Sequence, residues 1–390
     1  MKKFIVLFLV LLLAFAHITC VFAENSTKYT AVSKAAIEIP DAKSAVLMEA
    51  QTGEVIFSKE SDIELNPASV TKVMTLLLAA EALDEGKIKL TDKATVSAHA
   101  ASMGGSQVFL KEGEVMDVEE LIKCVVIASA NDAAVVLAEL VCGNESTFVS
   151  RMNERARELG MKHTNFENVT GLDDTTTNHY TSALDIAIMS RELIGHEIIL
   201  KYSSIWQDTI RNGEFTLTNT NRLVRFYDGC NGLKTGSTSK AGYCVSATAK
   251  RDGMQLIAVV MGAETRDKRN EVARNLLDFG FANYTLMKNP EAVIENIPIR
   301  CGVKDFAVAY EGEFSKLVSK TDASKIEKIY VLPDKLNAPI KAGANVGKVE
   351  YLLNGEKIGE AEIYLKEDIE KISFWMLFER IFCAVFSGAK

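Results

Sequence analysis

Ser69 and Lys72 stand three residues apart in the segment Ser69-Val70-Thr71-Lys72. On a helix, residues at this spacing share one face with their β-carbons about 5–6 Å apart, so the Lys72 amine can reach the Ser69 hydroxyl. A serine hydroxyl needs a base to become a good nucleophile, and a lysine that is screened from water among other cations has a pKa low enough to serve. The pair is a candidate nucleophile and general base, although a solvated lysine on a helix surface has the same spacing.

A second polar group follows about 60 residues later, where Ser129-Ala130-Asn131 comes directly after the apolar segment from Leu121 to Ala128. A hydroxyl and an amide at the end of such a segment can face a cleft. They can equally cap the start of a following helix, because Ser and Asn are preferred N-cap residues.

A third group, Lys234-Thr235-Gly236, falls inside a predicted strand. Glycine within a strand often marks the close approach of a ligand or of another backbone. A lysine ammonium and a threonine hydroxyl beside it can hold a carboxylate. The alternative is a surface lysine near a hairpin turn.

The hydrophobic pattern around these motifs predicts strands, then helices, then strands again. Ser44–Met48 and Glu54–Phe57 indicate a β-hairpin. Asn66-Pro67 predicts a helix start, with Asn66 as N-cap and Pro67 as the first helical residue, and helical periodicity continues to about residue 193. Later strands are expected at Phe215–Thr218, Gly232–Thr235, Gly242–Ala249 and Gln255–Met261, before a helix at Glu271–Phe281. This order predicts an α+β fold, in which an antiparallel sheet carries packed helices and a helical insertion.

Composition divides the chain into four parts. We expect a signal peptide at residues 1–23, the α+β domain at 26–288, a small all-β domain at 291–365 and an amphipathic helix at 367–390. Short alternating runs separated by Gly and Asn-Gly turns indicate the small all-β domain.

The first part has the features of a secretory signal. Lys2 and Lys3 precede an apolar run, and Val21-Phe22-Ala23 offers small residues before a cleavage point at Glu24. The alternatives are an uncleaved anchor helix and lipid attachment at Cys20. A cleaved signal predicts that the mature chain is exported.

The last part, residues 367–390, places aromatic and apolar residues around most of a helix. Ser373, Arg380 and Ser387 recur every seven residues and so share one side. Glu379 and Arg380 interrupt a run that is too short to span a bilayer comfortably. An amphipathic helix in the membrane interface is therefore expected, and the alternative is a tail packed on its own protein.

Composition also argues against two classes of site. The formal net charge of −8, without a basic block, argues against nucleic acid as the main partner. No His/Cys cluster has zinc spacing and no CxxC pair occurs, so no metal site is expected. We interpret the cysteines beyond residue 23 as buried thiols: Cys124, Cys142, Cys230, Cys244, Cys301 and Cys383.

The three polar groups, in this order and at these separations, resemble the motif set of class A β-lactamases and penicillin-binding proteins. Nearly the whole chain resembles the low-molecular-mass D-alanyl-D-alanine carboxypeptidases, with residues 26–288 as the D,D-peptidase domain. Ala130 departs from the Gly or Asp of many members. Further segments resemble that family: Asn66-Pro67-Ala68, Met103-Gly104-Gly105-Ser106, His163-Thr164-Asn165-Phe166, Thr170-Gly171-Leu172 and Ala241-Gly242-Tyr243.

The resemblance implies acyl transfer, with Ser69 as nucleophile, Lys72 as base and Ser129 as proton shuttle to the leaving D-alanine. It implies that Asn131 holds the substrate amide and Lys72. Further implied binding residues are Lys234, Thr235, Gly236 and Arg269 near the terminal carboxylate, and Ser237, whose backbone N–H joins that of Ser69 in an oxyanion hole.

The resemblance further implies peptidoglycan stem peptides as substrates, β-lactams as covalent inhibitors, and neither metal nor organic cofactor. It places the chain at the outer face of the bacterial cytoplasmic membrane. A serine β-lactamase is one alternative, for which Glu167 lies in the right interval to activate water but lacks the usual surrounding residues. A D,D-endopeptidase and a non-catalytic wall-binding module are the others.

Overall fold

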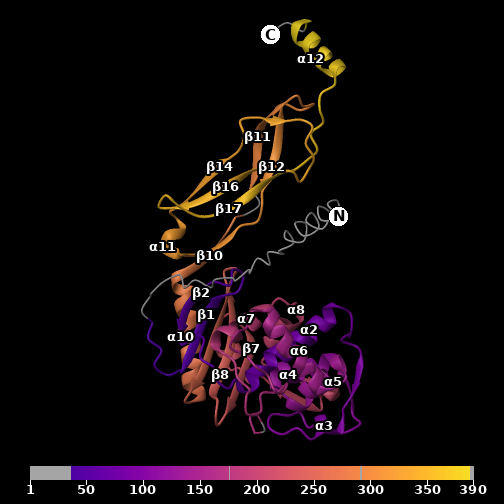
Figure 1. The fold of residues 1–390 in the computed structure, drawn as a ribbon, viewed down its shortest axis with the longest axis vertical. Coiled ribbons are helices and arrows are strands. Elements are labelled where there is room, and N and C mark those ends of the chain that lie inside the picture. The colour runs from indigo at the N-terminus through magenta and orange to yellow at the C-terminus, as the bar shows by residue number, and fades with distance from the viewer. Residues whose placement is uncertain (1–36, 175, 290–291, 387–390) are drawn as a thin grey trace, which may run out of the picture. The chain divides into compact units, whose positions relative to one another are not determined.

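The structure is a computed structural model that describes residues 37–174, 176–289 and 292–386. The predicted signal peptide, with its two competing interpretations, lies outside the described residues. Strands come first along the chain, then a long helical insertion, then strands again, and a second all-β part follows (Figure 1). The predicted α+β fold class is confirmed.

A five-stranded antiparallel sheet in the order β2-β1-β9-β8-β7 forms the centre of the first part. Every residue of β1 is buried, so this strand is covered on both faces of the sheet. The strands are β1 (Ser44–Glu49), β2 (Val55–Lys59), β7 (Cys230–Thr238), β8 (Gly242–Arg251) and β9 (Met254–Ala263).

Helices cover the sheet from both sides (Figure 1). Side chains alternate between the faces of a strand. Leu47 of β1 packs with Leu276 and Leu277 of α10 in one hydrophobic cluster. The Ser246 hydroxyl of β8 lies on the other face, 2.8 Å from the Ser190 hydroxyl of α7. The two covering helices are α7 (Ala183–Leu193) and α10 (Arg266–Asn283).

The insertion between β2 and β7 supplies most of the helices. Its α-helices are α2 (Lys72–Asp84), α3 (Ala98–Ala101), α4 (Val118–Ala128), α5 (Asn131–Cys142), α6 (Glu145–Glu158), α7, α8 (Glu197–Ser203) and α9 (Leu223–Phe226). It also holds the 3₁₀ turns η1 (Ala68–Thr71) and η2 (Arg211–Gly213), and two hairpins, β3 (Lys93–Thr95) with β4 (Val115–Asp117) and β5 (Gln207–Ile210) with β6 (Phe215–Thr218).

The helix start expected at Asn66-Pro67 is wrong in detail. Pro67 is the N-cap of the 3₁₀ turn η1, and α2 begins only at Lys72. Asn66 does not cap the turn, because its side-chain amide donates to the His179 carbonyl at 2.9 Å. Ala68 has a positive φ of 49°, so the chain bends sharply just before Ser69.

The second part is built on a six-stranded sheet in the order β14-β16-β17-β12-β11-β15. Its hydrophobic cluster includes Tyr351, Ile363 and Leu365. A separate pair joins β10 to β13, and Leu317 of β13 packs in the same cluster as α10. The elements are β10 (Tyr284–Lys288), β11 (Val293–Arg300), β12 (Phe306–Glu311), β13 (Ser315–Ser319), α11 (Lys320–Ala323), β14 (Ile326–Val331), β15 (Leu336–Asn337), β16 (Asn345–Leu353) and β17 (Glu356–Leu365).

The amphipathic helix predicted for residues 367–390 begins later than expected. The described helix is α12 (Phe374–Phe386), and the residues before it run along the second part. Ile369 pairs with Ile340 and is only 2% exposed, and the Ile372 amide donates to the Cys301 carbonyl at 2.9 Å. Burial of Ile369 in this cluster keeps the segment extended. Within the described residues, no single helix is long and apolar enough to cross a membrane. The bent helix pair α5–α6 has the length and composition of a membrane span, and these two properties are its only resemblance to one.

The expectation of buried thiols holds for only some of the cysteines. Cys124 and Cys244 are buried, whereas Cys301 and Cys383 are exposed. Cys301 lies in the loop after β11 and Cys383 on α12, where no core surrounds them.

Candidate active site

Ser69 and Lys72 meet as their spacing predicts. Ser69 lies in the turn η1 and Lys72 opens α2, and the Lys72 Nζ atom donates to the Ser69 Oγ atom at 2.9 Å. A second bond runs from Lys72 Nζ to the Thr170 carbonyl at 2.8 Å. The Lys72 side chain is completely buried. It is therefore held against the candidate nucleophile by neutral oxygen atoms.

Burial lowers the pKa of Lys72 well below its ordinary value, since the charged form is poorly solvated there. The positive charge of Lys234 lowers it further, and Asp132 opposes the shift. Among the described residues, no carboxylate forms an ion pair with Lys72. A neutral amine at this position can accept the Ser69 proton.

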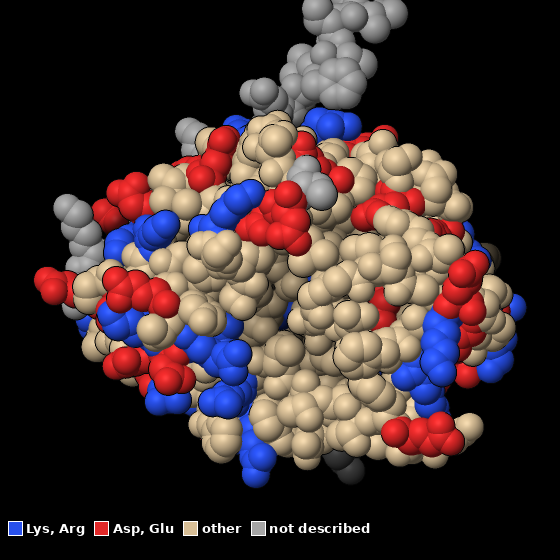
Figure 2. Space-filling model, turned by 90° about the horizontal axis from the view of Figure 1, so that it is seen from below, with Lys and Arg blue, Asp and Glu red and all other residues tan. Residues whose placement is uncertain are grey.

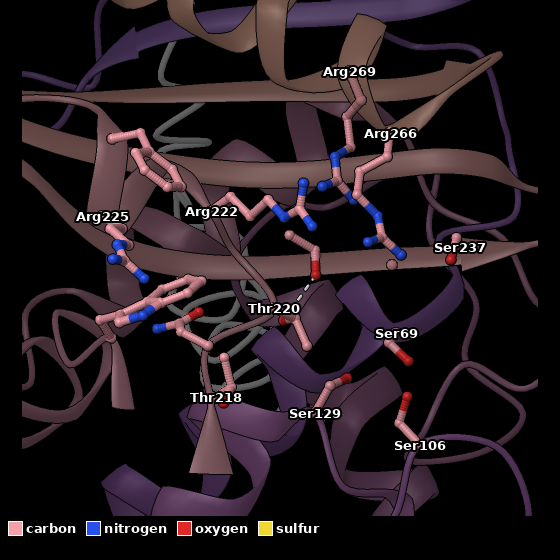
Figure 3. Close-up of a pocket in the computed structure, with 15 residues that line it drawn as sticks. Ser69, Ser106, Ser129, Thr218, Thr220, Arg222, Arg225, Ser237, Arg266 and Arg269 are labelled. Atoms are coloured by element: carbon pink, nitrogen blue, oxygen red, sulfur yellow. Dashed lines mark hydrogen bonds between the residues drawn. The ribbon is translucent and has the colours of Figure 1, made fainter. Parts of the chain in front are cut away.

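Strand β7 forms the opposite wall, and Gly236 brings it against the nucleophile turn. A Cβ atom at Gly236 would lie 2.8 Å from the Ser69 amide nitrogen and 2.9 Å from the Pro67 carbonyl oxygen. Such contacts are too short for any side chain, so this position requires glycine. The close approach brings the neighbouring residue Ser237 alongside Ser69 (Figure 3).

The Lys234 side chain contacts Ser129 and does not extend into the cavity. Its Nζ atom donates to the Ser129 Oγ atom at 2.7 Å and to the Thr235 carbonyl at 3.0 Å, and the side chain is fully buried. Burial, reinforced by the positive charge of Arg269, lowers the pKa of Lys234 to about 7. The ammonium therefore acts on the cavity through Ser129 and through its charge.

Ser129 occupies the break between α4 and α5 with a positive φ of 63°. Asn131 starts α5, and its side-chain amide donates to the Gly104 carbonyl at 2.6 Å. The Asn131 Oδ1 atom is buried and has no hydrogen-bond partner among the described residues. The expected hydrogen bond between Asn131 and Lys72 is absent from the described residues. Lys72 donates to Ser69 and Thr170 instead.

A cavity of about 630 Å³ lies between these two walls. Six residues predicted from the sequence line it: Ser69, Ser129, Thr235, Gly236, Ser237 and Arg269. Lys72, Asn131 and Lys234 lie behind the lining rather than in it. Figure 2 shows a hollow on one face of the molecule, with Lys and Arg side chains gathered along one of its edges.

Arg269 enters the cavity from α10 (Figure 3). Two of its nitrogens donate to the Asn270 Oδ1 atom, at 3.1 and 2.9 Å, and a third donates to the Cys244 carbonyl at 3.4 Å. Burial and the neighbouring Arg266 charge lower the pKa of Arg269 to about 10. The guanidinium remains charged at neutral pH and is held in one orientation.

Sequence reasoning missed Asp132, which follows the Ser129-Ala130-Asn131 motif. The buried Asp132 carboxylate accepts the amides of Val108 and Leu110, at 3.1 and 3.0 Å. It thereby holds the loop that presents Ser106 to the cavity. In the sequence, only its position directly after the motif could have indicated a role for Asp132.

His179 is a second missed residue. Its Nδ1 atom accepts the Glu167 amide at 3.0 Å, so the proton of the neutral ring is on Nε2, which donates to the Thr71 Oγ1 atom at 2.8 Å. Burial lowers the pKa of His179 to about 4. A neutral histidine thus ties the Glu167 backbone to the turn that carries Ser69.

Thr220 is a third. The Thr235 hydroxyl donates to the Thr220 Oγ1 atom at 2.9 Å, and both residues line the cavity. Thr220 lies in a loop that no motif indicated.

Two family models match the chain. The model described as D-alanyl-D-alanine carboxypeptidase matches residues 29–265, and that of the penicillin-binding protein 5 C-terminal domain matches residues 281–371. The carboxypeptidase DacF of Bacillus subtilis is 43% identical over 379 residues, with 95% of each chain covered. The carboxypeptidase DacC of Escherichia coli is 33% identical over 352 residues, with 87% of each covered.

Solved structures give the same result. Penicillin-binding protein 5 from Haemophilus influenzae aligns with a TM-score of 0.72 and 33% identity, over 87% of this chain and 100% of that chain. Penicillin-binding protein D2 from Listeria monocytogenes, solved in an ampicillin-bound form, aligns with a TM-score of 0.58 and 29% identity, over 64% of this chain and 100% of that chain.

Proposed function

Given that the chain belongs to the D-alanyl-D-alanine carboxypeptidase family and is a serine enzyme of that activity, we propose that Ser69 is the residue it acylates. The observation that carries this assignment is the 2.9 Å contact between the Ser69 hydroxyl and the buried Lys72 amine. Ser129, which also lines the cavity, contacts Lys234 from strand β7, whereas Ser69 has its lysine three residues along the same chain segment and lies in the turn that leads into α2.

Acylation begins when Lys72, as a neutral amine, takes the proton from Ser69. The Oγ atom then attacks the carbonyl carbon between the two terminal D-alanines. The backbone N–H groups of Ser69 and Ser237 bind the resulting oxyanion, and donors of this kind are worth about 3 kcal/mol of barrier each. The closeness of β7 to the nucleophile turn at Gly236 supports this pairing of donors.

Departure of D-alanine requires a proton on its nitrogen, and Ser129 is the group that delivers it. The Lys234 ammonium donates to the Ser129 oxygen, which lowers the cost of releasing the hydroxyl proton. Thr235 and Arg269 bind the terminal carboxylate, and the charge of Lys234 supports them from behind. The unpartnered Asn131 Oδ1 atom is available for an amide N–H of the substrate. Water then hydrolyses the ester on Ser69.

The alternative of a β-lactamase has no support at Glu167. The Glu167 carboxylate accepts the amides of Thr177 and Asn178, both at 2.9 Å, and does not line the cavity. It therefore serves the local loop rather than a hydrolytic water.

Mass spectrometry after incubation with penicillin tests the nucleophile. We expect one covalent adduct, on the peptide that contains Ser69. Ser69→Ala should lose both the adduct and the release of D-alanine from a soluble pentapeptide. Ser106→Ala is the matched control, since Ser106 also lines the cavity but has no lysine beside it. An adduct on Ser106 or Ser129 in the wild-type protein would refute the assignment.

We also propose that the chain is exported and that α12 attaches it to the outer face of the cytoplasmic membrane. The support is the exposure of large apolar side chains along this helix, which is costly in water and favourable at a lipid interface. The exposed residues are Phe374, Trp375, Met376, Leu377, Phe378, Ile381, Phe382, Val385 and Phe386, each at least 41% accessible. The apolar run and small residues of positions 1–23 support export.

Deletion of residues 373–390 tests the attachment and spares Ile369, which belongs to the β-domain core. The signal-processed full chain should sediment with anionic vesicles, and the truncated chain should remain in solution with unchanged hydrolysis of a soluble peptide. A double substitution, Trp375→Glu with Phe378→Glu, should also release it. Sedimentation of the truncated chain would contradict this role for α12.

A further inference from the structure

The cavity continues well beyond the residues that the reaction needs. One end holds Ser69, Ser129 and Ser237, and the other end holds Arg225 (Figure 3). We call this far end the distal arm and define it by Trp206, Thr218, Arg222, Arg225 and Phe226, which line the same cavity of about 630 Å³.

The distal arm opens on the leaving-group side of the scissile bond. Thr235, which we assign to the terminal carboxylate, donates to the Thr220 hydroxyl, and Arg222 follows Thr220 by two residues. In the close-up, Thr220 lies between Ser129 and the guanidinium of Arg222 (Figure 3). A group held in this arm is therefore attached to the amine that departs, not to the acyl part that stays on Ser69.

A guanidinium and two aromatic rings that contact each other form the floor of the arm. The Arg225 guanidinium lies 5.3 Å from the Trp206 ring and 5.4 Å from the Phe226 ring, within the range of cation–π attraction. The Phe226 ring is 65% exposed, and the Trp206 Nε1–H is buried without a hydrogen-bond acceptor among the described residues. This surface offers positive charge and flat apolar area to the same ligand.

The charge in the arm is not neutralised. Within residues 37–174, 176–289 and 292–386, no ion pair joins Arg222 or Arg225 to a carboxylate. Asp267 and Glu271 line an adjacent cavity with Arg222 but are not ion-paired to it. Arg266 and Arg269 line the nearer part of the main cavity. One carboxylate on the leaving residue needs at most two of these four cations.

The loop that carries the arm is anchored from behind. The buried Asn219 amide donates to the carbonyls of Ser203 and Ile205, at 3.0 and 2.9 Å. The buried Asn221 amide donates to the Gly232 carbonyl at 2.8 Å, and its oxygen accepts the Leu223 amide. Thr220 and Arg222 therefore have fixed backbones, as a specificity site requires.

We propose that the distal arm is a leaving-group subsite for a second carboxylate, placed beyond the carboxylate that adjoins the scissile amide. It rests on the proposed function, because it uses the same Ser69 attack. The Ser69 Oγ–carbon bond forms, the carbon–nitrogen bond breaks, and the departing amine takes a proton and carries the second carboxylate away. Two sources have this chemistry: an acidic side chain on the terminal D-residue, and a second peptide joined through its amine.

Hydrolysis of matched peptides by the full chain in detergent tests the subsite. The substrates are diacetyl-L-Lys-D-Ala-X with D-Ala, D-Gln or D-Glu as X, and a cross-linked peptide dimer. D-Gln and D-Glu differ only in the charge at the end of the side chain. We expect one of two results: kcat/KM is higher for D-Glu than for D-Gln, or it is higher for the dimer than for D-Gln. The difference should be about tenfold, which is the usual contribution of one charge-assisted hydrogen bond to binding. Preference for D-Glu identifies the side chain as the source, and preference for the dimer identifies the second peptide.

The variants decide whether the arm is responsible. Arg225→Gln should remove the preference, whereas Arg274→Gln, in the adjacent cavity but outside the main one, should keep it. The rate of acylation by penicillin reports whether each variant is folded. Should Arg225→Gln fail to fold, Arg222→Gln should reduce the same preference. No preference in the wild-type chain, or a preference that survives both substitutions, overturns the proposal. Failure to hydrolyse even the D-Ala peptide would instead overturn the proposed function.

Discussion

The peptidase part and the small β-domain each bury charged groups, and they treat them in opposite ways. In the β-domain, the Glu311 carboxylate is 1% exposed and is matched by the Lys328 ammonium at 2.9 Å and by Tyr330, Tyr351 and Asn289. Burial opposes ionisation there, but the hydrogen bonds from Tyr330 and Lys328 outweigh it and lower the pKa of Glu311.

The buried lysines of the peptidase part have no such compensation. Lys72 and Lys234 donate only to hydroxyl and carbonyl oxygens, and burial lowers the pKa of each. A compensated charge adds to a rigid structure, whereas an uncompensated one is kept near the point of losing its proton. The difference separates a structural network from the network that we propose is catalytic, and substitutions in either network test it.

Fixing the charge on Lys72 should have the largest effect. Arginine is effectively always protonated, so Lys72→Arg keeps the cation and loses the base. Acylation by a fluorescent penicillin should fall by about 10³-fold. Lys201→Arg, on an exposed lysine, is the matched control. Acylation of Lys72→Arg within tenfold of wild type would show that Lys72 acts only through its charge.

His179 sharpens the comparison as a buried group that stays neutral. An unfolded histidine binds a proton near pH 6.5, but folded His179 does so only near pH 4, so stability falls as pH falls through this window. The loss should reach about 3 kcal/mol by pH 4. Measured by denaturant unfolding with penicillin binding as the signal, it should be absent in His179→Gln.

His163→Gln is the control for that experiment, because its ring is 40% exposed. It should retain the stability loss of the wild-type chain. An equally steep loss in His179→Gln would mean that another group carries the pH dependence.

Removing the charge of Glu311 should cost about 2 kcal/mol, since it leaves the Lys328 cation without its partner. We expect Glu311→Gln to lower the unfolding temperature of the β-domain and to leave the rate of penicillin acylation unchanged. Calorimetry should resolve the two parts, and Glu327→Gln, on an exposed residue of β14, is the control. A matching loss of acylation would show that the two networks are not independent.

The smallest expected effect is a shift in pH dependence. The Lys234 cation disfavours protonation of Lys72, so Lys234→Gln should raise the pKa of Lys72. The acidic limb of the acylation rate should move to higher pH, whatever the loss in maximal rate. Lys250→Gln, on an exposed lysine of β8, should leave the limb in place. A limb that stays put or moves to lower pH would contradict the coupling.

Local motifs explain how much of the site the sequence predicted. Ser69 and Lys72 meet because their spacing along one helical turn encodes the contact. Gly236 could be predicted because a strand glycine signals close approach. The β-hairpin from Ser44 and the strand at Phe215–Thr218 followed from alternation and flanking turn residues.

Residues that act through distant contacts were not predictable in the same way. His179 is 108 positions from Thr71, and Thr235 meets Thr220 across a loop without a motif. The start of α12 was predicted seven residues too early, because the pattern of apolar residues did not reveal that Ile369 pairs with Ile340. Tertiary packing decided these features.

The position of β1 has a consequence for how the chain is made. β1 pairs with β2 and β9, and β9 follows it by roughly 200 residues. A ribosome adds about 5–20 residues per second, so some 10–40 seconds pass before the second partner strand exists. During that time an apolar strand has an open edge that can pair with other chains. Nascent chains of this protein should therefore depend on a holding factor until residue 263 has emerged.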